Sequence, residues 1–263
     1  MIFSNIHNFA LLAPWKTASN TLNLRLGHLN ESPYSAIHDF NEHLLRIAHQ
    51  HITYLEFLGL PESRCDPTVG AFVRNPYDRA YSGFMQLRWD IGVLPQADFR
   101  LPWVRESVLE HMERLAVQIR AADGDFDTWF ASVREDQIYA IGSGSSFGLY
   151  PCHYWTGTGG NKQIAFVGKV EDYESDLQRF CDLVGVTQRN QTQSANVRFS
   201  EQAGAAEHQY RYADRMSPAS IDKINALFDR DFELFDYQRL GAGSRNTQAS
   251  AWGKLGFDGS TRT

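Results

Sequence analysis

The stretch of sequence that decides the fold is Phe9-Ala-Leu-Leu-Ala-Pro-Trp-Lys-Thr-Ala-Ser-Asn-Thr21. Its first five residues are a continuous apolar run, which is typical of a strand buried on both faces of a sheet. Pro14 ends the run, and the Ser19-Asn20-Thr21 cluster can cap a helix that continues to Leu29. The stretch therefore predicts a strand, a loop and a helix, in that order.

The same order of elements recurs further along the chain. Val69–Val73 is a second apolar run, and Pro76 fits the first position of a following helix that Asn75 caps. Three further amphipathic helices are expected, over 104–120, 171–184 and 218–231. Segments 152–155 and 163–167 flank a glycine-rich turn and predict a hairpin. Strands that alternate with helices indicate an α/β fold with a mainly parallel sheet.

The composition is that of one globular domain. The chain has 263 residues, 43% of them hydrophobic, which is enough for one large core and excludes a disordered or fibrous protein. We expect a single domain over 1–240 and a loose Gly/Ser/Thr-rich tail over 241–263. The net charge of -6 argues against nucleic acid or an anionic membrane as a partner. Any anion site must therefore be local, and the 20 Arg against 5 Lys favour the side chain that forks around phosphate or sulfate oxygens.

Cysteine usage and the amino terminus predict the compartment. Cys65, Cys152 and Cys181 form no CxxC pair, which argues against a disulfide framework or a structural zinc site. The apolar run near the amino terminus is too short for a signal segment or a membrane span, and no basic segment precedes it. We expect a cytoplasmic protein without a membrane span.

The loop over 14–21 is the first candidate anion site. It lies where a strand of an α/β sheet gives way to a helix, so backbone N–H groups and the positive end of the helix dipole meet there. Lys16 and the neighbouring hydroxyls add charge and hydrogen-bond donors. The alternative is an ordinary capped helix with a surface lysine. A Walker A motif is absent from the chain, and its nearest imitation, Gly157-Thr-Gly-Gly-Asn-Lys162, lies within the predicted hairpin.

Arg74 and Ser82 form the second candidate anion site. Arg74 follows the second strand, and Ser82 lies on the next helix, which rises about 9 Å from Pro76 to Ser82. An anion that touches both side chains must lie alongside that helix. In the alternative interpretation Arg74 pairs with Asp78 and Ser82 fills a contact that needs a small residue.

The pair His49 and His51 is the candidate for proton transfer. Imidazole, with a reference pKa of about 6.5, is the side chain suited to accept a proton from a hydroxyl near neutral pH. His-x-His on a strand is also a metal-ligand pattern, although no third ligand lies at a recognisable spacing. A pair with a purely structural role is the other alternative.

Four motifs stand in one order between residues 9 and 237. They are Lys16-Thr-Ala-Ser, Val73-Arg-Asn-Pro-Tyr-Asp-Arg with Ser82, Phe166-Val-Gly-Lys-Val-Glu171, and Phe228-Asp-Arg-Asp-Phe-Glu-Leu-Phe-Asp-Tyr237. In this order and spacing they resemble the carbohydrate sulfotransferases that use 3'-phosphoadenosine 5'-phosphosulfate (PAPS). The segment 48–57 is similar to the His-x-His segment of the heparan-type uronyl 2-O-sulfotransferases. The resemblance, to sulfotransferase family 2, implies a P-loop-like three-layer sandwich with helices on both sides of the sheet.

The resemblance also implies roles for individual residues. His51 would be the catalytic base, with His49 beside it in the acceptor site, and Arg74 and Ser82 would bind the 3'-phosphate. The residues implied for the 5'-phosphosulfate are Lys16, Thr17, Ala18, Ser19, Asn20 and Thr21. Lys16 would also neutralise charge on the leaving oxygen.

The acceptor is less well defined by the sequence. Arg79 and Arg88 follow on the same helix and could face an anionic sugar, or could simply be solvated. The resulting prediction is a PAPS-dependent sulfotransferase that acts on a saccharide hydroxyl by in-line transfer, releases adenosine 3',5'-bisphosphate (PAP) and needs no metal. A P-loop-type nucleotide kinase and a non-catalytic saccharide-binding module are the alternatives, and the acceptor's identity and the oligomeric state stay open.

Overall fold

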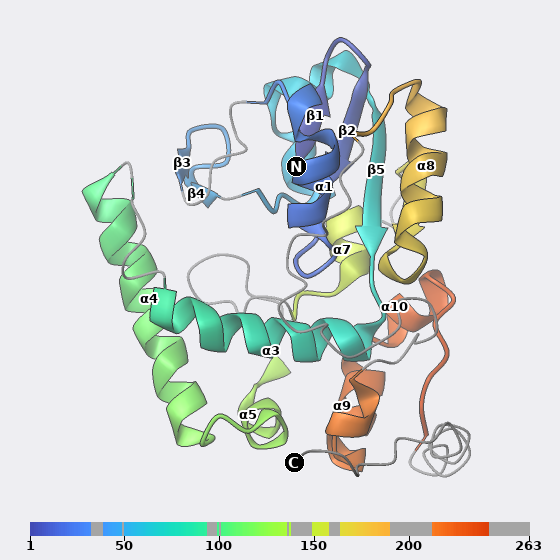
Figure 1. Cartoon of the computed structure of the whole chain (residues 1–263). Helices are drawn as coiled ribbons and strands as arrows, with labels where there is room; N and C mark the ends of the chain where they lie inside the picture. Colours follow the sequence, from blue (N-terminus) through green and yellow to red (C-terminus); the bar gives the residue numbers. More distant parts are fainter. Residues whose placement is uncertain are drawn as a thin grey trace, which may run out of the picture.

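A computed structural model describes most of the chain (Figure 1). The described residues are 1–32, 39–48, 50–93, 99, 101–135, 137, 149–157, 164–189 and 212–241. The tail expected over 241–263 lies outside them except for its first residue, as do His49 and most of the glycine-rich turn over 156–162.

A four-stranded sheet forms the centre of the fold. Its strands, in spatial order, are β1 (Ile2–Ser4), β2 (Phe9–Leu12), β5 (Thr68–Val73) and β6 (Phe166–Lys169). β1 pairs antiparallel with β2, whereas β2, β5 and β6 are parallel. Leu12 lies opposite Ala71 in the β2–β5 register, so the loops that follow these two strands leave the same edge of the sheet side by side.

Helices cover both faces of this sheet because successive strand residues point to opposite sides. Phe9 and Leu11 pack with helices α1 (Ser19–Leu26) and α8 (Tyr173–Val184). Ala10 and Leu12 pack with the segment around helix α2 (Tyr54–Leu58). The expected mainly parallel sheet with flanking helices is therefore confirmed.

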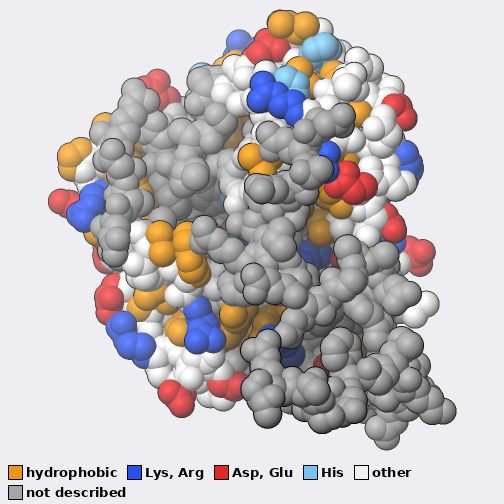
Figure 2. All heavy atoms as spheres, viewed as in Figure 1, with side chains coloured by type: hydrophobic (Ala, Val, Ile, Leu, Met, Phe, Trp, Pro, Cys, Tyr) orange, Lys and Arg blue, Asp and Glu red, His pale blue; other side chains and the backbone are white. Residues whose placement is uncertain are grey.

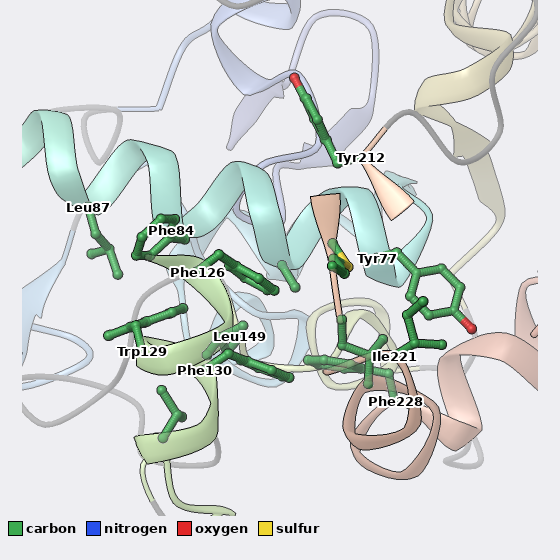
Figure 3. Packing of buried hydrophobic residues seen from close by; sticks show 14 of the residues in the cluster. Tyr77, Phe84, Leu87, Phe126, Trp129, Phe130, Leu149, Tyr212, Ile221 and Phe228 are labelled. Carbon is green, nitrogen blue, oxygen red and sulfur yellow. The ribbon is translucent and has the colours of Figure 1, made fainter. Parts of the chain in front are cut away.

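A second, helical core lies beyond the carboxyl ends of the strands (Figure 1). Its helices are α3 (Pro76–Val93), α4 (Pro102–Ala121), α5 (Phe126–Ser132), α9 (Pro218–Leu227) and α10 (Asp229–Leu234). Figure 3 shows Phe84 and Leu87 of α3 pointing toward Trp129 and Phe130 of α5. The rings of Phe84 and Trp129 have their centroids 5.1 Å apart, and both side chains are buried. α3 therefore has its apolar stripe in this core and its opposite side toward the sheet.

The remaining elements are short. β3 (Asp39–Asn41) and β4 (Arg46–Ala48) form a separate antiparallel pair, and α7 spans Cys152–Thr156. Four 3-10 segments complete the described chain, at Gly27–Leu29, Pro61–Cys65, Val170–Asp172 and Ala213–Arg215.

The hairpin predicted around residues 152–167 is wrong. Cys152–Thr156 is helical, and β6 pairs in parallel with β5. The cause is a distant partner: the carboxylate of Asp231 accepts hydrogen bonds from the backbone N–H groups of Cys152 and His153, at 2.7 and 2.9 Å, and so supports the first turn of α7. The helix expected over 218–231 is two helices, α9 and α10, which meet at Phe228.

The visible surface mixes charges of both signs. Figure 2 shows blue and red side chains interspersed over the described part of this face. None of the helices in the described ranges is long and apolar enough to cross a membrane. The three cysteines are free thiols, with Cys65 exposed and the other two buried.

Candidate functional site

The loop between β2 and α1 has an unusual backbone path. Lys16 and Ala18 both have positive φ, 65° and 63°, a region that costs a residue with a Cβ about 1–2 kcal/mol. Thr17, between them, is fully buried, and its hydroxyl donates to the carbonyl of Pro14 at 2.7 Å. The loop is thus held in a strained conformation by its own hydrogen bonds, which is typical of ligand-binding segments.

The start of α1 is suited to an anion. Ala18 occupies the N-cap position, where it offers no side-chain oxygen to the first-turn amides, and the first turn contains no acidic residue. The amide dipoles there present partial positive charge. Ser19 is half-buried in this turn, Thr21 is buried, and Asn20 is exposed, with its Oδ1 accepting from Gln50 Nε2 at 3.4 Å. Because Ala18 provides no side-chain cap, the alternative of an ordinary capped helix is not supported.

The side chain of Lys16 is half-buried, and its ammonium group points toward α3. Its Nζ donates to Gln86 Oε1 at 3.1 Å, and Gln86 Nε2 donates to Asp90 Oδ1 at 2.6 Å. Burial and, to a lesser extent, the nearby charge of Arg74 lower the pKa of Lys16 to about 8, while the carboxylate of Asp90 acts in the opposite direction. Lys16 therefore titrates near physiological pH.

Arg74 lies at the carboxyl end of β5, directly beside the first loop. Its NH1 donates to the backbone oxygen of Lys16 at 3.5 Å, and its guanidinium lies 5.9 Å from the centre of the Tyr212 ring. Asp78, the partner considered for Arg74, accepts from the backbone N–H of Tyr212 at 2.8 Å. Ser82 is half-buried on α3, one turn before Gln86. The two predicted anion-binding elements thus meet at one edge of the sheet.

His51 lies against the same loop. The residue is 7% exposed, and its Nδ1 is 2.5 Å from the carbonyl oxygen of Ala13. A carbonyl only accepts, so Nδ1 carries the proton and Nε2 is the basic nitrogen of the neutral ring. The indole rings of Trp15 and Trp155 lie 6.3 Å from the His51 ring, centre to centre. The imidazole is therefore fixed in orientation and in tautomer.

Gln50 connects the histidine segment to α1. Its Oε1 accepts from Asn23 Nδ2 at 2.6 Å, and its Nε2 donates to Asn20. His51 and the loop over 13–18 are thus held together by contacts on both sides, whereas His49 lies outside the described residues.

The structure does not bring the two predicted acceptor arginines to this site. Arg79 is fully buried, donates to the Tyr150 carbonyl at 2.8 Å and lies 3.6 Å from the carboxylate of Asp231. Arg88 is exposed on the opposite side of α3, where its guanidinium packs over Phe84 at 5.8 Å and beside Gly124. The expectation that these side chains face an acceptor does not fit either placement.

Two side chains at the site were missed from the sequence. Gln86 and Asp90 follow Ser82 at steps of four residues, a helical spacing that places all three along one side of α3 and could have been recognised.

We find no candidate metal site in the part of the chain that the structure describes. No group of three or more His, Cys, Asp or Glu side chains there could hold a metal ion. The described site contains two cations, the backbone amides at the start of α1 and one imidazole.

Comparison with known proteins gives one match. A family model described as the sulfotransferase family matches residues 1–238. No curated protein matches the chain significantly, and neither does any solved structure. The matched range includes both predicted anion-binding elements and the histidine segment.

Proposed function

The chain belongs to the sulfotransferase family, and on that basis we propose that it moves a sulfuryl group from PAPS to a saccharide hydroxyl by in-line displacement. Membership makes it a transferase of sulfuryl groups. The identity of the donor, the class of acceptor and the roles of individual residues belong to the proposal.

The observation that supports the proposal most strongly is the contact between Lys16 and Arg74. Their loops follow neighbouring parallel strands, and the guanidinium of Arg74 reaches the Lys16 carbonyl at 3.5 Å. PAPS has a phosphosulfate at its 5' position and a phosphate at its 3' position, so it needs two cationic sites within one nucleotide's length. The uncapped start of α1 and Lys16 would bind the first group, and Arg74 with Ser82 the second.

The chain's own residues would then contribute positioning and charge. Lys16 would neutralise the negative charge that grows on the oxygen leaving sulfur, and the α1 amides would hold the 5'-phosphate. His51 would accept the acceptor's proton at Nε2, because its Nδ1–H is committed to the Ala13 carbonyl. One loop would therefore orient both the donor and the base.

A saccharide acceptor is favoured by the surroundings of His51. The segment over 48–57 is similar to that of uronyl 2-O-sulfotransferases, and two indole rings, those of Trp15 and Trp155, lie next to the imidazole. Indole faces pack well against the apolar side of a sugar ring.

The direct test is a transfer assay with sulfur-labelled PAPS. The acceptors are desulfated uronic-acid glycans, neutral glycans and a simple non-sugar alcohol. Transfer to a glycan alone supports the proposal, and transfer only to the alcohol would overturn the acceptor class. Calorimetric binding of PAP, compared with ADP plus Mg²⁺, separates a sulfotransferase from a kinase, because tighter binding of ADP with Mg²⁺ contradicts a PAPS site.

The variant His51→Ala tests the assignment of the base. It should bind PAP as the parent does and lose transfer by about 10²–10⁴-fold. The matched control is His28→Ala, since His28 is an exposed imidazole on the surface segment after α1. Full transfer by His51→Ala would move the base elsewhere.

A further inference from the structure

Lys16 is connected to α3 by a chain of two hydrogen bonds. Its Nζ donates to Gln86 Oε1 at 3.1 Å, and Gln86 Nε2 donates to Asp90 Oδ1 at 2.6 Å. Gln86 and Asp90 are both half-buried, and the chain leads from the loop that follows β2 to the second half of α3. Two elements far apart in sequence are thereby coupled through a single amide.

The orientation of that amide is determined by its neighbours. An ionised carboxylate only accepts hydrogen bonds, so the NH₂ end of Gln86 must face Asp90. The carbonyl end then faces Lys16, which only donates. Asp90 therefore selects the one orientation of Gln86 that offers Lys16 an acceptor.

We propose that Gln86 and Asp90 are positioning residues for Lys16: Gln86 holds the ammonium group at the donor site, and Asp90 fixes the amide and keeps the lysine charged. This inference rests on the proposed function for its catalytic consequence, since only a protonated Lys16 can neutralise the leaving oxygen. The contacts themselves do not depend on that function.

The charges around Lys16 oppose one another. Arg74 faces it from the end of β5 and disfavours its charge, and Asp90 faces it from α3 and favours it. On the other side of the loop, His51 lies at Ala13. Burial raises the pKa of Asp90 to about 6, while its hydrogen bond from Gln86 and the charge of Lys16 act in the opposite direction. Near pH 7 most of Asp90 is thus ionised while most of Lys16 keeps its proton.

The first experiment titrates Lys16 directly. The chain has five lysines, so ¹³Cε resonances of labelled lysine can be assigned with Lys16→Arg and followed against pH. In Asp90→Asn the amide contact can persist but the charge is gone, so the pKa of Lys16 should fall by about half a unit or more, and Asp90→Glu should restore it. If the pKa of Lys16 in Asp90→Asn stays within about 0.2 units of its value in the parent protein, the inference is overturned.

A matched control exists on α8. Gln178 Nε2 donates to Asp182 Oδ1 at 2.8 Å, which is the same pair of residue types at the same spacing. Gln178→Leu and Asp182→Asn should leave the Lys16 titration unchanged. If they shift it as much as the α3 variants do, the effect is not local and the inference fails.

Kinetics separate positioning from folding. Gln86→Leu should lower kcat for sulfate transfer about tenfold with the KM for PAPS changed less than about twofold. In Asp90→Asn the alkaline limb of kcat/KM should move to lower pH, because that profile reports the free enzyme's groups. A Gln86→Leu enzyme with parental kcat would overturn the positioning role.

The two proposals fail in different ways. A parent protein that transfers no sulfate from PAPS removes the proposed function, and the lysine titration then still decides whether Asp90 controls Lys16. A parent that transfers sulfate, with an unmoved titration in Asp90→Asn, keeps the function and removes this inference.

Discussion

Replacing Asp231 should strongly lower the free energy of unfolding. This residue is 1% exposed on α10 and accepts hydrogen bonds from the backbone of Cys152 and His153 and from His153 Nδ1, the last at 2.7 Å. Its Oδ2, which accepts from the Cys152 N–H, also lies 3.6 Å from the guanidinium of the fully buried Arg79. Asp231→Ala therefore removes the support of α7 and leaves a cation buried without its carboxylate.

The expected cost follows from the burial of that pair. Removing one member of a buried ion pair typically costs about 3–5 kcal/mol, because the remaining charge stays desolvated. At roughly 2–4 °C per kcal/mol for a chain of this size, the melting temperature should fall by about 6–20 °C. Since α7 holds Trp155 against the His51 ring, transfer should fall as well, even where the protein is still folded.

Urea unfolding of Asp231→Ala beside Asp229→Ala measures this cost. Asp229 lies on the same helix and pairs with Arg239, but that pair is exposed, so its loss should cost less than about 1 kcal/mol. The double variant Arg79→Met, Asp231→Leu should recover part of the loss, because apolar replacement of a buried pair is often tolerated. Equal costs for the two single variants would refute the reasoning.

Three other outcomes are expected. Lys16→Ala should reduce kcat more than PAP affinity, and Arg74→Ala should do the reverse, as steady-state kinetics and calorimetry can measure. Gly157→Ala should cost about 2–5 kcal/mol in urea unfolding, since φ there is 65° and a Cβ would overlap the Tyr54 ring. Burial raises the pKa of Asp90 from 3.8 to about 6, so the folded state is penalised as pH rises through this range. Asp90→Asn should therefore gain stability over the parent between pH 4 and 7, by at most about 3 kcal/mol in unfolding at each pH.

The sequence predicted the parts of the fold that local chemistry controls. Phe9–Leu12 and Thr68–Val73 are strands, as short apolar runs bounded by turn residues favour, and both are buried between helices on the two faces of the sheet. Pro76 begins α3 as its fixed φ dictates, and the loop that contains Lys16 lies at the end of a strand, as expected.

Distant partners explain what the sequence could not predict. Cys152–Thr156 looked like a strand, and a carboxylate 79 residues away makes it a helix. Arg79 and Arg88 were grouped because they share a helix, yet nine residues turn the chain by about 900°, which puts them on opposite sides. Arg79 is buried against the Tyr150 carbonyl and Asp231 of α10, and Arg88 lies over Phe84.

Ser82, Gln86 and Asp90 follow one another at a regular spacing on α3, so the helix sets their positions along the site. Each step of four residues advances about 6 Å along the axis and returns to nearly the same side, so the groups are measured out by the helix pitch alone. One inserted residue between Ser82 and Gln86 would rotate everything after it by about 100°. Substitutions along α3 can therefore change the site while its geometry is kept, whereas an insertion or deletion between these residues would move Gln86 and Asp90 away from Lys16.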